Sequence, residues 1–256
     1  MRLPRRLRHG EEATLVEHLD ELRSRIIVSL VAVIIGTTVA FIFQHRILHA
    51  LNGPLPPKQR EQGILTLGVV EPFLITFKIC LWAGLGLAFP FVLWQLWGFL
   101  APAVEERSQR ILVGFVAFAS ALLAIGVVFG YYVVLPNALK FLTTYNDQTF
   151  DIRIQASSYY SFVMLVLVGM GVVFELPIFV LALVRLGILS SYRLRHTRRI
   201  GYFIICCVGV ALPGIDPVTT TIETIPLLFL YEGSIWLAVL MERYWERRAT
   251  FSFDSP

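Results

Sequence analysis

Four ionisable side chains, Lys78, Glu175, Glu223 and Glu232, lie within long apolar segments of this chain. A charge at the centre of a membrane-spanning helix costs about 2.5–3.5 kcal/mol, so each of the four requires a physical reason. Glu175 is the most informative, because Pro177 follows closely and frees backbone carbonyls, which predicts a bent helix around a polar pocket. We expect a functional carboxyl group there. The alternative is a protonated Glu175 that hydrogen-bonds a neighbouring helix merely for packing.

The other three have simpler interpretations. Lys78 lies close enough to the end of its segment for its ammonium to reach the outer interface. Glu223 is expected in water at the outer mouth of the last segment, whereas the role of Glu232, deeper in that segment, is left open. Asp216 lies in the turn 213–217, where an aspartate either caps the following helix or serves function.

Carboxylates also occur in two segments that are otherwise expected to be basic. Asp20 and Glu21 form one pair, and Glu105 and Glu106 form the other. Acidic pairs in such places suggest a cationic ligand. The alternative for the first pair is that Glu21 and Arg25 form a helical i, i+4 ion pair, worth only a few tenths of a kcal/mol.

The sequence lacks the motifs of several enzyme classes. It has no G-x-x-x-x-G-K-[ST] for nucleotides, no H-E-x-x-H for zinc and no G-x-S-x-G nucleophile turn. Its three cysteines, Cys80, Cys206 and Cys207, fall in apolar segments without metal-ligand spacing. We therefore expect no catalytic residue, no metal and no other cofactor.

Helices in lipid must position these side chains. The 256 residues are 56% hydrophobic and 16% charged, with a mean hydropathy of +0.70, whereas soluble domains are about 25% charged. The sequence predicts an all-α membrane protein with six transmembrane helices, at 26–43, 72–97, 111–135, 159–184, 200–212 and 222–241. The fifth would span only about 20 Å of a hydrocarbon core about 30 Å thick.

Basic residues predict the topology. If both termini are cytoplasmic, the inside segments hold 16 of the 22 Lys and Arg residues and the outside loops hold five, which is the bias that cytoplasmic loops show. The net charge of +4 therefore reports topology and not nucleic-acid binding. We expect a cytoplasmic segment 1–25 with an amphipathic helix at 15–25, a six-helix transmembrane domain 26–241 and a cytoplasmic tail 242–256.

The segment from His18 to Arg25, H-L-D-E-L-R-S-R, resembles the N-terminal signature of the TatC family of twin-arginine protein translocases. Further matching stretches are Glu71-Pro72-Phe73 with Lys78, Phe89-Pro90 through Gln95, Phe99-Leu100-Ala101-Pro102, Phe174-Glu175-Leu176-Pro177 and Asp216-Pro217. The resemblance extends to about Met241. It implies a cupped bundle of six helices with the last two short and both termini cytoplasmic, in the bacterial cytoplasmic membrane.

The resemblance also implies a function. Members of the family bind twin-arginine signal peptides of folded precursors, recruit TatA-type and TatB-type single-span subunits, and use the proton motive force to export the precursor without covalent catalysis. The expected partners are therefore these subunits, the precursors, membrane lipid and further copies of the chain in the receptor complex.

The resemblance assigns site residues in two groups. Glu21 matches the family's signal-binding glutamate, and Arg23 and Phe99 belong to the same group. The second family glutamate would fall at Ser108, so our hypothesis is that Glu105 or Glu106 replaces it. The second group, expected to meet a partner subunit or to form an intramembrane polar site, contains Glu175, Pro54, Gln95 and Asp216, and it departs from the family pattern in having Thr220 where a glutamine is usual.

Other functions compete with this interpretation. A proton-coupled transporter of small solutes would use Glu175 and Glu232 in the membrane, but the chain shows no internal repeat. An intramembrane hydrolase lacks a nucleophile motif. A structural scaffold would use its polar residues only to hold helices together.

Overall fold

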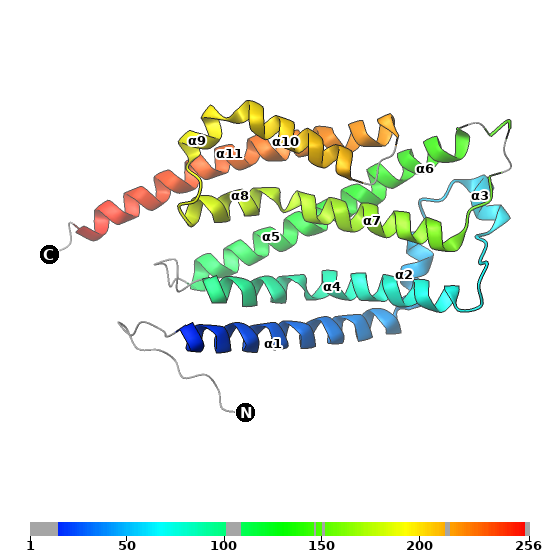
Figure 1. The fold of residues 1–256 in the computed structure, drawn as a ribbon, viewed down its shortest axis with the longest axis horizontal. Coiled ribbons are helices and arrows are strands. Elements are labelled where there is room, and N and C mark those ends of the chain that lie inside the picture. Colours follow the sequence, from blue (N-terminus) through cyan, green and yellow to red (C-terminus); the bar gives the residue numbers. More distant parts are fainter. Residues whose placement is uncertain (1–14, 101–108, 146, 150–151, 213–215, 254–256) are drawn as a thin grey trace. The chain divides into compact units, whose positions relative to one another are not determined.

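The computed structural model describes residues 15–100, 109–145, 147–149, 152–212 and 216–253. Its regular elements are helices: α1 (Leu15–Ile42), α2 (Gln44–Leu51), α3 (Pro57–Gln62), α4 (Glu71–Leu100), α5 (Gln109–Phe129), η2 (Gly130–Val134), α6 (Leu135–Thr144), α7 (Ala156–Phe174), α8 (Leu176–Arg185), α9 (Ser191–His196), α10 (Arg198–Ala211) and α11 (Pro217–Phe253) (Figure 1). This order confirms the predicted all-α class.

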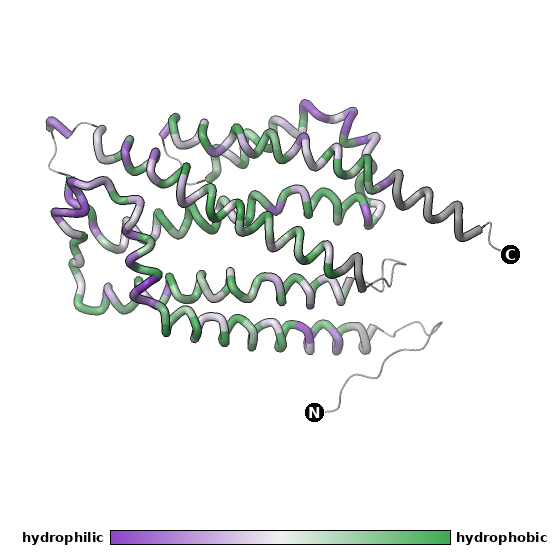
Figure 2. The backbone as a smooth tube through the Cα atoms, turned by 180° about the vertical axis from the view of Figure 1, so that it is seen from behind, coloured by the Kyte–Doolittle hydropathy of each residue, from purple (hydrophilic) through white to green (hydrophobic). Residues whose placement is uncertain are grey.

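Five helical stretches are long and apolar enough to cross a membrane within these described ranges: Leu19–Ile42, Glu71–Phe99, Val113–Thr144, Ala156–Arg185 and Pro217–Glu242. They correspond to the predicted first, second, third, fourth and sixth segments. Figure 2 shows hydrophobic residues along these helices and hydrophilic residues mainly near helix ends and in the connections. The predicted fifth segment is α10, which has 14 residues and spans about 21 Å, so it is short as expected. The count of six spans stays a prediction.

Two helices are longer than expected. α11 has 37 residues and continues to Phe253, so the expectation that the last helix is short is wrong. The polar stretch after Met241 contains good helix formers, and no proline interrupts it before residue 256. α1 is continuous over 28 residues, so the N-terminal segment and the first span form one helix without a break at residues 25 and 26.

The chain forms two compact units. One comprises Met1–Gln44 and Cys80–Phe118, and the other comprises His45–Ile79 and Ala119–Pro256. In the first unit, α1 packs antiparallel to the second part of α4. A Cβ on Gly84 would collide with the backbone of Thr37, so glycine allows the two helices to approach closely. Further along the unit, the rings of Trp97 and Phe115 stack with centroids 4.1 Å apart.

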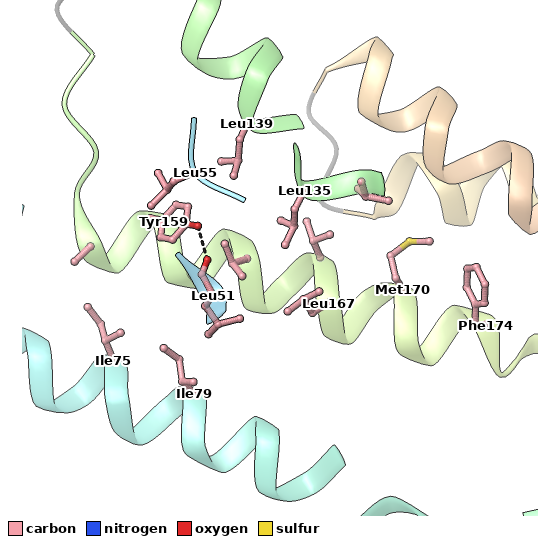
Figure 3. Close-up of a cluster of buried hydrophobic side chains, with 14 residues drawn as sticks. Leu51, Leu55, Ile75, Ile79, Leu135, Leu139, Tyr159, Leu167, Met170 and Phe174 are labelled. Atoms are coloured by element: carbon pink, nitrogen blue, oxygen red, sulfur yellow. Dashed lines mark hydrogen bonds between the residues drawn. The ribbon is translucent and has the colours of Figure 1, made fainter. Parts of the chain in front are cut away.

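The second unit has two hydrophobic clusters. The larger one joins α2, the start of α4, η2, α6 and α7, and Figure 3 shows it around Tyr159, whose hydroxyl donates a 2.7 Å hydrogen bond to the carbonyl of Leu51. The other cluster joins α8, α9, α10 and α11 and includes the fully buried Leu227 and Ile235. The short α10 is thus packed along the longer α11, whose side chains shield one of its faces.

Candidate functional site

Glu21, the first candidate for binding a cation, already contacts the guanidinium of Arg25 within the first unit. The Nε and Nη2 atoms of Arg25 donate hydrogen bonds of 2.9 and 2.6 Å to Oε1 of Glu21. The side chains of Arg25 and Glu21 keep 27% and 30% of their surface exposed. The i, i+4 ion pair considered as the alternative therefore exists, and it lies at a surface where a ligand can reach it.

Arg25 also connects α1 to α4. Its Nη1 atom donates to the backbone carbonyl of Gln95 at 3.2 Å and to the side-chain Oε1 of the same residue at 3.4 Å. A Cβ on Gly98 would collide with the guanidinium, so the glycine one turn beyond Gln95 leaves room for it. The structure thus places Gln95, expected in the partner-subunit group, beside the pair formed by Glu21 and Arg25.

The remaining members of the first group are partly described. Arg23 is exposed on α1. Phe99 is half-buried on α4 and follows Gln95 by four residues, so the two lie on the same face of the helix. Glu105 and Glu106 lie outside the described residues. The sequence indicated Arg25 only as a possible i, i+4 ion-pair partner of Glu21. Its contact with Gln95 was missed, because no local sequence pattern predicts a contact between residues 70 positions apart.

Glu175 interrupts the fourth span. α7 ends at Phe174 and α8 begins at Leu176, with Pro177 in its first turn. The helix is therefore interrupted where Pro177 led us to expect a bend, and the polar pocket stays a prediction. The Glu175 side chain is 4% exposed, and its Oε1 atom has no hydrogen-bond partner among the described residues. A buried carboxyl oxygen without a partner among the described residues can accept a hydrogen bond from, or donate one to, a group that approaches from outside.

Asp216 caps the last helix. Its Oδ1 atom accepts a 2.7 Å hydrogen bond from the backbone N–H of Thr219, and the residue is 5% exposed. This bond satisfies one of the free donors at the start of α11. The capping interpretation of Asp216 therefore accounts for its position.

Glu223, two turns further along α11, is fully buried, and neither carboxyl oxygen has a partner in the described part of the chain. The expectation that Glu223 is solvated is wrong. The helices η2, α6 and α7 pack against α11, and this tertiary packing excludes water from the first turns of α11.

Glu232 is paired. Its Oε1 atom accepts a hydrogen bond from the hydroxyl of Tyr202, and its Oε2 atom lies 3.6 Å from Nη1 of Arg198. Both partners belong to α10. The carboxylate therefore joins the short helix to α11, and the transporter interpretation loses one of its two free carboxyl groups.

Pro54 lies in a loop held by its neighbours. The hydroxyl of Tyr131 donates to the carbonyl of Ala50 at 2.6 Å, and that of Tyr160 donates to Oδ1 of Asn52 at 2.8 Å. Arg60 donates to the carbonyl of Leu55 at 3.2 Å. These bonds fix the turn on η2 and α7, so Pro54 contributes to the shape of the loop.

Glu71, which sequence reasoning used only as part of a matching stretch, joins two loops. Its Oε2 atom accepts from the N–H groups of Leu67 and Gly68 at 2.7 and 3.1 Å, and its Oε1 atom accepts from Ser157 at 3.1 Å. Close by, Leu65 and Gln155 form a short β-bridge. No group of three or more potential metal ligands occurs in the residues that the structure describes.

The chain matches the family model described as Sec-independent protein translocase protein (TatC) over residues 17–226. It is 35% identical to the TatC protein of Aquifex aeolicus, over 90% of this chain and 96% of that protein. It is 34% identical to the TatC protein of Deinococcus radiodurans, over 88% and 86% of the respective chains. A crystal structure of the twin-arginine translocase receptor TatC in DDM is similar with a TM-score of 0.76 and 34% identity, over 86% of this chain and 99% of that one. These matches cover the helices that carry Glu21, Gln95 and Glu175, and the chain belongs to the TatC family of Sec-independent protein translocase proteins.

Proposed function

We propose that this chain is the signal-peptide receptor of its translocase and binds the arginine pair of twin-arginine precursors through Glu21. Membership of the TatC family makes it a non-enzymatic subunit of a Sec-independent protein translocase in a membrane. The similar crystal structure is that of a twin-arginine translocase receptor, and this likeness supports the step from subunit to receptor.

The observation that carries the proposal is that the Glu21 carboxylate already accepts two N–H groups of a guanidinium, from Arg25. Its geometry and partial exposure therefore suit an arginine side chain. Arginine pairs with carboxylates through a planar fork of donors that lysine lacks. Arg23, Phe99 and either Glu105 or Glu106 are the further proposed contacts of the signal peptide.

The receptor function requires the N-terminus and the Glu21 end of α1 on the cytoplasmic side. The excess of Lys and Arg in the segments 1–25, 98–110, 185–199 and 242–256 supports this orientation, with six spans and both termini inside. We further propose that TatA-type and TatB-type subunits bind the chain, that copies of it assemble in the receptor complex, and that the proton motive force drives transport.

Glu175 is the proposed contact for a polar side chain of a partner subunit's helix. Its buried Oε1 atom, which lacks a partner among the described residues, supports this role. Glu175→Ala should reduce co-purification of a TatB-type subunit, whereas Glu175→Gln, which keeps a hydrogen-bonding group, should retain most of it. Equal co-purification of both variants with wild type would contradict the role.

The receptor proposal is tested with the purified chain in nanodiscs and a precursor whose signal carries either Arg-Arg or Lys-Lys. We expect tight binding of the Arg-Arg precursor and a loss of at least tenfold for the Lys-Lys precursor or for Glu21→Gln, which corresponds to about 1.4 kcal/mol or more. Glu61→Gln is the matched control, since Glu61 is exposed on α3. Equal binding of both precursors by the wild-type chain would overturn the proposal.

A further inference from the structure

The guanidinium of Arg25 makes two separate sets of hydrogen bonds. Nε and Nη2 point to Glu21, one turn earlier on the same helix. Nη1 points to Gln95 on α4, where both a backbone carbonyl and a side-chain oxygen accept it. The two sets use different nitrogen atoms, so the bonds to Gln95 do not require those to Glu21.

Glu21 is bound through only one of its oxygens. Both donors of Arg25 reach Oε1, and Oε2 accepts no hydrogen bond from the residues that the structure describes. A second guanidinium can form the two parallel bonds of a fork only if both oxygens are available. An ammonium group, as a compact point charge, needs only one oxygen.

We propose that Arg25 is a resident guanidinium that occupies Glu21 in the free protein and that an arginine of the bound peptide displaces it. This inference rests on the proposed receptor function and deepens it. When the peptide arginine takes both oxygens of Glu21, the Arg25 side chain stays attached to Gln95 through Nη1. The exchange replaces one guanidinium by another, so the carboxylate is never left without a cation.

This exchange makes Arg25 a determinant of specificity. A ligand gains full access to Glu21 only if its own bonds replace those of Arg25. A bidentate arginine can do so, whereas a lysine, with one point charge, gains less from the same displacement. The partial exposure of both side chains keeps the resident pair weak enough to open, because water screens exposed ion pairs and leaves them little net stability.

The test compares binding of the Arg-Arg precursor to wild type, Arg25→Gln and Arg25→Lys in nanodiscs. Removal of the resident competitor should tighten binding by about two- to fivefold in Arg25→Gln. Arg25→Lys keeps the charge and the long stem but loses the fork, so its binding should improve by a smaller factor. Arg193→Gln, which removes an exposed arginine of α9, is the control for the loss of one positive charge.

A double-mutant cycle separates the competition of Arg25 with the peptide arginine for Glu21 from other effects of the positive charge of Arg25. In the Glu21→Gln background there is no carboxylate to compete for, so Arg25→Gln should change binding less than twofold. If Arg25 only positions Glu21, both Arg25 variants bind the precursor equally or more weakly than wild type, and the inference is overturned. Failure of the receptor proposal can be distinguished from failure of this inference, because the wild-type chain would then bind Arg-Arg and Lys-Lys precursors equally.

Discussion

Tyr202 on α10 donates a hydrogen bond to the carboxylate of Glu232 on α11, and the rings of Tyr202 and Tyr231 meet edge to face with centroids 5.7 Å apart. α10 has too few residues to cross a bilayer of ordinary thickness by itself. The contacts of α10 with α11 therefore hold it in the fold, and polar contacts between membrane helices are worth about 0.6–2 kcal/mol each.

Tyr202→Phe should lower the stability of the protein by about 1 kcal/mol, because it removes the donor to Glu232 and keeps the aromatic packing. The measurement is thermal unfolding in detergent. Tyr132→Phe is the matched control, since the Tyr132 side chain is 71% exposed. An unchanged melting temperature for Tyr202→Phe would mean that the hydrogen bond from Tyr202 to Glu232 does not help to hold α10.

Glu223→Leu should stabilise the protein by about 1–3 kcal/mol, because the wild-type carboxyl group is buried without a hydrogen-bond partner in the described residues. Glu223→Gln keeps the shape and the polarity and should change stability less. The melting temperatures of both variants in detergent test this, with Glu61→Leu on the exposed face of α3 as a control. Destabilisation by Glu223→Leu would indicate that the carboxyl group has a partner in the assembled protein.

The comparison of Glu175 with Glu223 shows what the sequence could predict. The interruption of the helix at Glu175 followed from Pro177, a local rule, and the structure shows it. The burial of Glu223 depends on which helices pack against the start of α11, and no local pattern encodes that. The apolar runs located five long spans and the short α10, whereas the contact of Arg25 with Gln95 depends on the register between two antiparallel helices.

Glu71→Ala should loosen the two loops that the carboxylate joins. Three backbone N–H groups, of Leu67, Gly68 and Ser157, lose their acceptor, and a lost bond to a charged group costs about 1.5–3 kcal/mol. Hydrogen exchange at residues 65–68 and 155–158 should increase by at least tenfold, with Asp147→Ala as the control for an exposed acid. Unchanged protection would show that the bridge between Leu65 and Gln155 suffices.

The proposed orientation predicts where introduced cysteines react. The background is a chain in which Cys80, Cys206 and Cys207 are replaced by alanine. In cells whose inner membrane is intact, Lys58→Cys on α3 should react with a membrane-impermeant maleimide. Arg193→Cys on α9 should react only after that membrane is opened. Both positions are exposed, so the difference reports the side of the membrane and not burial. The reverse pattern would place Glu21 outside, where no signal peptide of an unexported precursor could reach it.

Because the count of basic residues is the main support for the orientation, this labelling tests the receptor proposal independently of any binding measurement.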